Sequence, residues 1–327
     1  MTTSHPVLLS IVIPVFNEEH GIAHFHESLG AALTKINDIA YEVIYADDGS
    51  TDRTLEIIQN IAKHDKTVRI VGLSRNFGKE YALTAGISQA NGDAIMTIDG
   101  DGQHPVSSIA LFVEEWQKGA QVVVGFAKSS HNRGFKKLRS KMFYRAFNNI
   151  TGENLQPEST DFRLIDREVQ QAFLKLGETD RITRGLIDWL GFDRTIVYFD
   201  PLDRSFGNAS YNTRQLVRLA INSFVSLSPV PLYIFGYTGV IITILSGLLG
   251  LAVIIEQLFL GDPLGWKFTG TAMLGILILF LVGILLMAQG IVSLYISHIH
   301  NQSKRRPLYV INHKHSIGMD KATEREL

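Results

Sequence analysis

Residues 8–15 read LLSIVIPV, and the stretch FNEE follows at residues 16–19. An uninterrupted apolar run rich in β-branched side chains fits a strand buried on both faces, as in a parallel sheet covered by helices. Runs of the same kind occur at residues 41–46, 68–73, 94–98 and 121–124. Helical patterns separate them, at residues 21–35, 51–64, 80–91 and 106–118. This alternation predicts an α/β fold with a mostly parallel sheet.

Polar clusters accompany the ends of four of these strands. They are PVFNEE at residues 14–19, DDGSTD at 47–52, SRNFGK at 74–79 and DGDGQHP at 99–105. In open α/β sheets, ligands bind beyond the carboxyl ends of the strands. Any one cluster could be only a turn or a helix cap. Acidic residues in three of four successive loops instead indicate one shared binding site.

Asp99 and Asp101 form the most specific of these clusters. Two carboxylates one residue apart can share a divalent cation, and the small Gly100 and Gly102 let ligand oxygens approach. Mg²⁺ prefers a few protein carboxylates together with substrate phosphate oxygens. The chain has no Gly-x-x-x-x-Gly-Lys-Ser/Thr loop and no Gly-x-Gly-x-x-Gly after its first strand, which argues against P-loop hydrolases and dinucleotide-dependent oxidoreductases. The residues favour a metal–diphosphate site in which the nucleotide is a leaving group.

The composition limits the partners and the chemistry. The 327 residues include 31 Lys and Arg against 32 Asp and Glu, a formal net charge of −1. Near-neutrality argues against nucleic acid as a partner, because such proteins present a basic face. The absence of cysteine excludes disulfides, thiolate zinc sites and cysteine nucleophiles.

Residues 232–297 differ from the rest of the chain, because they contain only three charged side chains, Glu256, Asp262 and Lys267. Two apolar runs in this segment each exceed the roughly 20 helical residues needed to cross a bilayer. They predict two transmembrane helices, at about 232–256 and 270–297, joined as a hairpin by the turn residues 261–265. The alternative is a pair of buried helices in a soluble core.

Basic residues predict the orientation of this hairpin. Those that flank the two apolar runs are Arg214, Arg218, Lys304, Arg305 and Arg306. The connecting loop has Lys267 alone. By the positive-inside rule, we expect a multi-pass protein of the inner or plasma membrane with the catalytic domain and both termini in the cytoplasm.

The same patterns predict the domain organisation. Residues 1–211 would form the catalytic domain, and residues 232–297 the membrane domain. Between them, residues 212–231 have one apolar and one basic face, as expected of a helix lying along a membrane surface, although an amphipathic helix on the soluble domain would read similarly. Residues 298–327 would be a basic and polar cytoplasmic tail.

The ordered set of motifs resembles the family 2 glycosyltransferases with a GT-A fold, and more narrowly the polyprenyl-phosphate glycosyltransferases of the bactoprenol glucosyltransferase and dolichyl-phosphate mannose synthase group. The motifs are SIVIPVFNEE from Ser10, DDGSTDRT from Asp47, RNFGKEYALTAGISQANGD from Arg75, DGDGQHP from Asp99, TDFRLIDR from Thr160 and RRPLYV from Arg305. The resemblance covers almost the whole chain, and it implies a GT-A catalytic domain followed by the membrane hairpin.

The resemblance also implies roles for individual residues. Asp161 matches the residue that acts as catalytic base, and Asp101 is expected to act with it. The nucleotide sugar would be bound by Pro14, Glu18, Asp48, Asp99, Arg181 and Arg204. A divalent cation, Mg²⁺ or Mn²⁺, would be held by Asp99, Asp101 and Gln103. The phosphate of the acceptor would be bound by Lys128, Lys136, Arg139, Arg163 and Arg184.

The implied reaction moves a hexose from a nucleotide sugar onto undecaprenyl or another polyprenyl phosphate, with inversion at the sugar. UDP-glucose is the favoured donor, while GDP-mannose, UDP-GlcNAc or UDP-galactose, and another lipid or glycan acceptor, stay open. A non-catalytic, sugar-nucleotide-binding membrane scaffold is the alternative from another class. Family members often assemble with themselves, so a homo-oligomer is a further open expectation.

Overall fold

The computed structural model describes residues 7–36, 39–128, 159–178, 181–202, 244, 248, 270–303 and 306–319. The chain divides into two compact units. One contains residues 1–148, 153–210 and 306–327, and the other contains residues 149–152 and 211–305.

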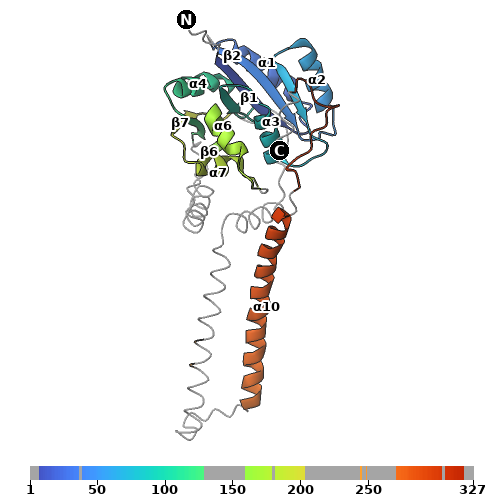
Figure 1. Ribbon diagram of the computed structural model, residues 1–327, viewed down its shortest axis with the longest axis vertical. Helices are drawn as coiled ribbons and strands as arrows, with labels where there is room; N and C mark the ends of the chain where they lie inside the picture. The colour runs from blue at the N-terminus through green and yellow to red at the C-terminus, as the bar shows by residue number, and fades with distance from the viewer. Residues whose placement is uncertain are drawn as a thin grey trace. The chain divides into compact units, whose positions relative to one another are not determined.

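The described strands form one seven-stranded sheet in the order β3-β2-β1-β4-β6-β5-β7 (Figure 1). In chain order they are β1 (Val7–Val15), β2 (Ile39–Asp47), β3 (Val68–Gly72), β4 (Ala94–Thr97), β5 (Val122–Ala127), β6 (Ser159–Asp166) and β7 (Arg194–Phe199). Neighbours are parallel except at β6, which runs antiparallel to β4 and β5. The predicted α/β fold with a mostly parallel sheet is confirmed.

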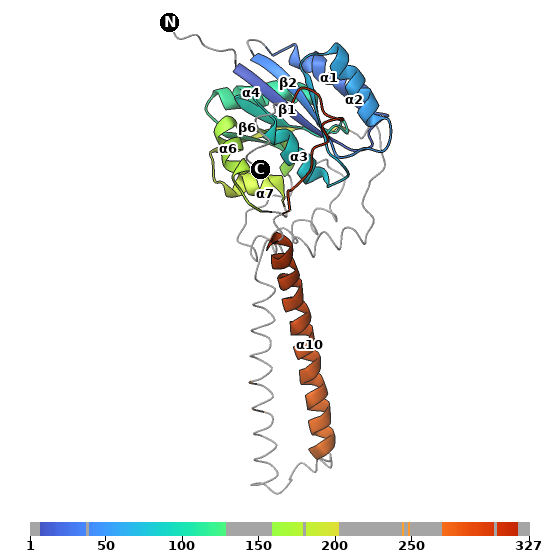
Figure 2. The same ribbon diagram turned by 45° about the vertical axis from the view of Figure 1, so that its right-hand side comes forward.

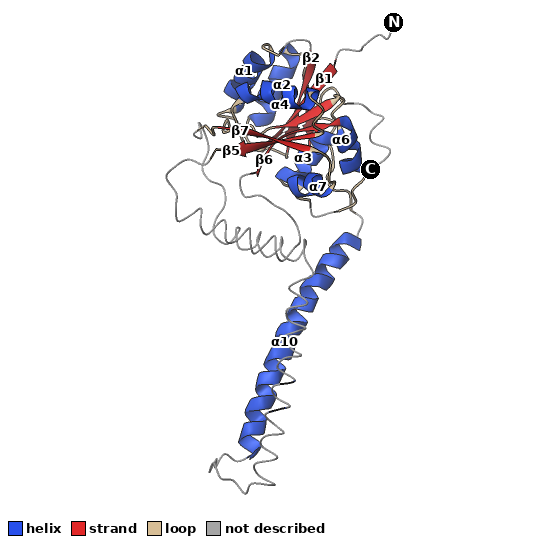
Figure 3. Cartoon of the chain, turned by 90° about the vertical axis from the view of Figure 1, so that its left-hand side faces the viewer, coloured by secondary structure: helices blue, strands red, loops and turns tan. Residues whose placement is uncertain are grey.

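Helices cover both faces of this sheet (Figure 3). On one face lie α1 (Ile22–Leu33), α2 (Thr54–His64), the 3₁₀ turn η1 (Val106–Ser108) and α4 (Ile109–Gln117). On the other lie α3 (Lys79–Ser88), α6 (Arg167–Leu174) and α7 (Thr183–Trp189). Figure 2 shows α1 and α2 side by side. The sheet is therefore buried between two helical layers.

The sequence of β1 explains this burial. Ile11 and Ile13 pack into the core beneath α1, α2 and α4, whereas Val12 packs into the core beneath α3, α6 and α7. All three are fully buried. A strand with consecutive apolar residues, as at positions 11–13, can supply both cores, since successive side chains point to opposite faces.

Helix α3 lies unusually close to the sheet. A Cβ added at Gly86 would lie 2.3 Å from Cγ1 of Val12, so only glycine permits this approach. Residues 82–88 of α3 are all buried. The first turn of α3, which carries Lys79, is thereby fixed at the carboxyl ends of the strands.

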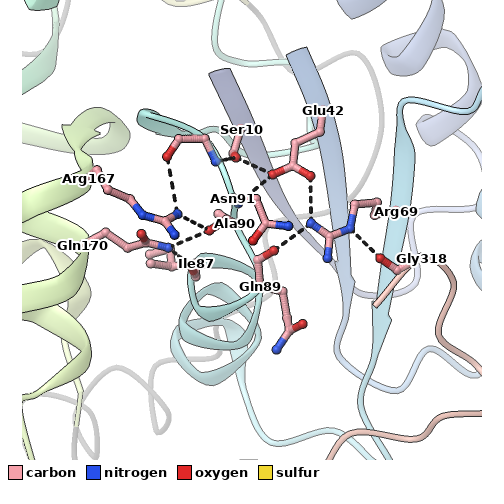
Figure 4. Close-up of polar contacts among 11 residues, drawn as sticks. Ser10, Glu42, Arg69, Ile87, Gln89, Ala90, Asn91, Arg167, Gln170 and Gly318 are labelled. Carbon is pink, nitrogen blue, oxygen red and sulfur yellow. Dashed lines mark hydrogen bonds and ion pairs between the residues drawn. The ribbon is translucent and has the colours of Figure 1, made fainter. Parts of the chain in front are cut away.

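A polar network fixes the other end of α3 (Figure 4). Arg69 of β3 donates through Nη1 to Glu42 Oε2 at 2.7 Å and to the Gln89 carbonyl at 2.8 Å. Arg167 donates to the Ala90 carbonyl at 2.7 Å. Cations at a helix carboxyl terminus satisfy the last carbonyls and complement the helix dipole.

Residues 306–319 add to the outer edge of the sheet. Ile311 and Ile317 form antiparallel bridges with Leu73 and Ile70. Arg69 Nε donates to the Gly318 carbonyl at 2.7 Å (Figure 4). An exposed edge strand invites pairing with other chains. This part of the predicted polar tail covers the edge of β3.

Helix α10 (Gly270–Ser303) belongs to the second unit and contains the second predicted membrane helix. Most of the first predicted membrane helix and the predicted interfacial segment lie outside the described residues. Within the described part of the chain, no helix meets the length and apolarity needed to cross a membrane.

Candidate functional site

Hydrogen bonds connect the polar loops at the carboxyl ends of the strands. Asn17, in the left-handed conformation with φ of 56°, accepts the Thr51 backbone N–H through Oδ1 at 2.9 Å. Asp48 in turn accepts the backbone N–H of Phe77 at 2.7 Å and that of Gly78 at 2.9 Å. The first three polar clusters of the sequence therefore form one continuous structure.

Lys79 joins this structure to the fourth cluster. Its Nζ lies 2.6 Å from Asp99 Oδ1 and 2.7 Å from Asp161 Oδ2. Asp161 comes from β6, whose antiparallel pairing with β4 sets Thr97 opposite Arg163. Thr97 Oγ1 also donates to the Asp161 carbonyl at 2.5 Å. An ammonium group held between two carboxylates is thus the electrostatic centre of the site.

Burial and neighbouring charges have opposite effects on the pKa values of Asp161 and Lys79. Burial by itself raises the pKa of Asp161, but the Lys79 ammonium, followed by Arg184 and Arg163, brings that pKa below its usual value. Burial likewise disfavours the charged form of Lys79, yet Asp99 and Asp161 hold its pKa well above the ordinary range. Asp161 is therefore a carboxylate and Lys79 a cation at neutral pH.

The loop before α3 aims Lys79 into the site. Gly78 has a φ of 116°, which a residue with a side chain rarely adopts. The Asp48 carboxylate, buried to 3% exposure, holds the Gly78 N–H. Burial raises the pKa of Asp48, while the bonds from Phe77 and Gly78 lower it. The predicted contact of Asp48 with the nucleotide stays a prediction, and its observed partners are in this loop.

The predicted cation ligands lie together after β4. Asp101 Oδ1 accepts the Gln103 backbone N–H at 3.1 Å, and Asp99 Oδ1 faces Lys79. No group of three or more His, Cys, Asp or Glu side chains in the described ranges could hold a metal ion alone. Two carboxylates and an amide oxygen nevertheless suit Mg²⁺ or Mn²⁺, provided that a bound diphosphate supplies further oxygens. The residues fit a cation that binds together with a phosphate ligand.

A small cavity adjoins these ligands. Its volume is about 120 Å³, and Glu18, Asp101 and His104 line it together with residues of α1. His104 stacks on Phe162, the neighbour of Asp161, with ring centroids 5.1 Å apart. The structure thus brings the predicted nucleotide residue Glu18 to the predicted metal ligand Asp101. Pro14 lies near the end of β1, partly buried.

Arg163 is buried, with 2% of its side chain exposed, and its guanidinium is occupied. It donates to Asp188 Oδ1 at 2.7 Å and to Asp188 Oδ2 at 3.3 Å. Further bonds go to the carbonyls of Thr160 and Arg184 at 3.2 Å each. A contact with an acceptor phosphate would require this pairing to open. In the observed geometry Arg163 holds β6 against α7.

One donor of Arg181 has no partner in the described part of the chain. Its other nitrogens donate to the carbonyls of Leu176 and Glu178, and its guanidinium lies 4.9 Å from the ring centroid of Phe173. Nη1 is buried and has no hydrogen-bond partner among the residues that the structure describes. Burial lowers the pKa of this group. A buried donor without a partner is costly, so the predicted contact of Arg181 with the nucleotide sugar stays a prediction.

The structure says less about the other residues that are predicted to bind phosphate. Lys128 Nζ lies 3.1 Å from Asp200 Oδ2, and both side chains are more than half exposed. The positive charge of Arg184 helps to lower the pKa of the Asp161 carboxylate. Outside the described residues lie Lys136, Arg139 and Arg204.

The motifs give Lys79 no role, although the structure places it at the centre of the site. The one feature of the local sequence that distinguishes Lys79 is its position directly after Gly78, the glycine at the start of α3. A cation there opposes the helix dipole. Such a conflict with local preference marks functional positions.

Comparisons with known proteins identify the class of this site and fold. The family model described as glycosyl transferase family 2 matches residues 10–173. An uncharacterized glycosyltransferase of Synechocystis sp. is 37% identical over 93% of this chain and 94% of its own length. The bactoprenol glucosyl transferase of Shigella phage SfV is 34% identical over 94% of this chain and 98% of its own length. The chain belongs to glycosyl transferase family 2, and it is a glycosyltransferase.

Solved structures resemble the chain more distantly. Glucosyl-3-phosphoglycerate synthase from Mycobacterium tuberculosis is 22% identical, with a TM-score of 0.46 over 68% of this chain and 79% of its own. The mannosyltransferase from Pyrobaculum calidifontis, in complex with GDP-Man and Mn²⁺, is 16% identical, with a TM-score of 0.45 over 63% of this chain and 59% of its own.

Proposed function

We propose that this glycosyltransferase moves a hexose, glucose from UDP-glucose in the favoured case, onto the phosphate of a polyprenyl phosphate. The observation that carries the proposal is the likeness, over nearly the full length of both chains, to proteins named bactoprenol glucosyl transferase. The site supports it, because Asp99 and Asp161 share a contact with Lys79, and Arg184, whose guanidinium suits phosphate, acts on Asp161 through its charge.

Donor binding would use the loop after β4. A Mg²⁺ or Mn²⁺ ion held by Asp99 and Asp101 would stabilise the charge that develops on the departing diphosphate. Gln103 would add an amide oxygen to this cation site, and the cavity that Glu18 and Asp101 line would take part of the nucleotide. The chain's own contribution is to hold these oxygens in place before the donor arrives.

Transfer also requires the phosphate of the acceptor to approach the phosphates of the donor, and these negative charges repel each other. Arg184 supplies positive charge on the α7 side of the site, and we expect Arg181 to add to it when a phosphate is bound. A phosphate monoester has a second pKa of about 6, so it is already mostly ionised at neutral pH. Asp161 is therefore needed less as a strong base than as a group that positions the acceptor or an arginine.

A membrane location would fit this acceptor. The support is the segment of residues 232–297 with its three charged side chains. On α10, the apolar side chains of Leu274, Leu285 and Ile296 are each at least 60% exposed, as expected of a helix that contacts lipid or another apolar surface. We propose that residues 232–256 and 270–297 cross the membrane, that residues 212–231 lie on its surface, and that the catalytic unit faces the cytoplasm. Both substrates would then meet at the headgroup plane, where confinement raises the effective concentration of the lipid.

Sugar transfer by the detergent-purified full-length protein tests the proposal. Undecaprenyl phosphate and Mg²⁺ or Mn²⁺ would be supplied with labelled UDP-glucose, UDP-galactose, UDP-GlcNAc or GDP-mannose. We expect label to enter the lipid phase from UDP-glucose, in a product stable to alkali and labile to mild acid, and no transfer by Asp101→Ala. Transfer from another donor would correct the sugar, and alkali-labile product would indicate a different lipid acceptor.

Metal-dependent nucleotide binding without transfer from any of these donors would contradict the proposed reaction and point to another sugar or acceptor. Absence of nucleotide binding would favour the scaffold alternative over an enzyme of this kind. The presence of Asp99, Asp101 and Asp161 speaks against that alternative, because these are the side chains that the chemistry requires.

A further inference from the structure

Lys79 is held in place by more contacts than is usual for a lysine at the protein surface. Asp48 fixes the Gly78 N–H, Gly78 turns the chain at a φ of 116°, and Lys79 then begins α3. Its Nζ contacts Asp99 and Asp161 at 2.6 and 2.7 Å. The fold therefore places this cation against the helix dipole and between two acids that the proposed reaction uses.

The contact with Asp99 has a consequence for metal binding. Asp99 Oδ1, which the ammonium contacts at 2.6 Å, is also an oxygen that a divalent cation would need. Two cations cannot both approach one carboxylate closely unless further negative charge offsets their repulsion. In the free protein the described partners of the ammonium are Asp99 and Asp161, and a nucleoside diphosphate would add the missing negative charge.

We propose that Lys79 makes binding of the divalent cation depend on the donor. In the free protein the ammonium acts as the counter-ion of Asp99 and Asp161 and opposes metal binding. When the donor diphosphate is present, its charge accommodates both cations, and Lys79 continues to hold Asp161. Lys79 is in this sense a positioning residue. The inference rests on the proposed function, because it concerns the order in which the donor and the divalent cation bind.

The test measures binding of Mn²⁺ alone to the full-length protein, by the electron paramagnetic resonance signal of free Mn²⁺. Lys79→Met keeps an apolar stem and removes the charge. Removing a unit charge roughly 4 Å from a divalent ion removes a repulsion that is substantial even at the dielectric constant of water, so we expect Mn²⁺ to bind at least tenfold more tightly. Saturating UDP should reduce this difference, since its phosphates offset the lysine in the parent protein.

Two further variants control the result. Lys79→Arg keeps the charge and should retain the weak binding of Mn²⁺ alone. Arg75→Met removes a cation of the same loop whose guanidinium lies 4.0 Å from the ring centroid of Phe77, and it should leave Mn²⁺ affinity unchanged. If Lys79→Met does not fold, Lys79→Gln provides the same measurement.

The inference is wrong if Lys79→Met binds Mn²⁺ alone no more tightly than the parent protein, or if neither binds it. An equal gain in Arg75→Met would also overturn it, because the effect would then be one of overall charge. These outcomes are independent of sugar transfer. A failure of the transfer assay with a positive Mn²⁺ result would contradict the proposed reaction and leave the lysine's effect on the metal established.

Discussion

Removing Asp188 from its ion pair with Arg163 should be among the most destabilising single substitutions in the catalytic unit. Arg163 is almost fully buried, and Asp188 binds it through both carboxylate oxygens at 2.7 and 3.3 Å. Asp188→Ala would remove the acid and leave a guanidinium in the core whose remaining described bonds go to the carbonyls of Thr160 and Arg184. The perturbation therefore tests a buried guanidinium that has lost its bidentate acidic partner.

The expected loss of stability in Asp188→Ala can be worked out from the burial of Arg163. Breaking a buried ion pair by removing one partner costs about 3–5 kcal/mol. For a domain of roughly 150–250 residues, each kcal/mol shifts the melting temperature by about 2–4 °C. The expected loss is therefore about 6–20 °C. Arg163→Met combined with Asp188→Leu should recover part of this loss, because apolar residues of similar volume can replace a buried pair.

The assay is thermal unfolding of the full-length protein in detergent, followed by tryptophan fluorescence. The chain offers a matched control in Lys128 and Asp200, an ion pair at 3.1 Å whose side chains are 56% and 80% exposed. Exposed pairs contribute about 0–1 kcal/mol, so Asp200→Ala should shift the melting temperature by at most a few degrees. Similar shifts for Asp188→Ala and Asp200→Ala would refute the reasoning from burial.

Two other predictions concern α3 and the acid beside it. Gly86→Ala should destabilise the protein by about 1–3 kcal/mol in urea unfolding through the clash with Val12. Gly30→Ala, which meets no atom within 4 Å, should instead stabilise α1 by about 0.5–1 kcal/mol; equal effects would contradict the packing argument. Because Lys79 keeps the pKa of Asp161 low, this carboxylate stays ionised throughout pH 5–8. Asp161→Asn should then retain transfer within about tenfold at neutral pH and lose it more steeply below pH 6, whereas a much larger loss at pH 7.5 would make base catalysis dominant.

Much of the fold could be predicted because its signals are local. The apolar runs of β1 to β5 reflect burial on both faces, and the acidic loops after them follow from the geometry of a parallel sheet. Strand β6 gives no such signal, since its sequence STDFRLID carries charged residues at Asp161, Arg163 and Asp166. Arg163 is buried there with Asp188, 25 positions away, as an acidic partner that binds it through both oxygens.

The site was predictable to a similar extent, and for the same reason. The motifs locate Asp99, Asp101 and Asp161, because metal and phosphate chemistry restricts the residue types. They do not predict that Asp161 enters the site from an antiparallel strand, or that Lys79 contacts two of these acids. Both facts depend on pairing between segments more than 60 residues apart, which no local pattern encodes.

The placement of Lys79 depends on the whole of α3 rather than on its own loop. At the far end of the helix, Arg69 and Arg167 bind the carbonyls of Gln89 and Ala90. Arg69 also binds the Gly318 carbonyl, so residues 306–319 support the same anchor. A helix fixed at its carboxyl end and pressed onto β1 at Gly86 cannot shift along its axis without breaking these contacts. The position of the ammonium between two carboxylates is therefore maintained by contacts that extend to the opposite end of the sheet, and changes remote from the site can alter its electrostatics.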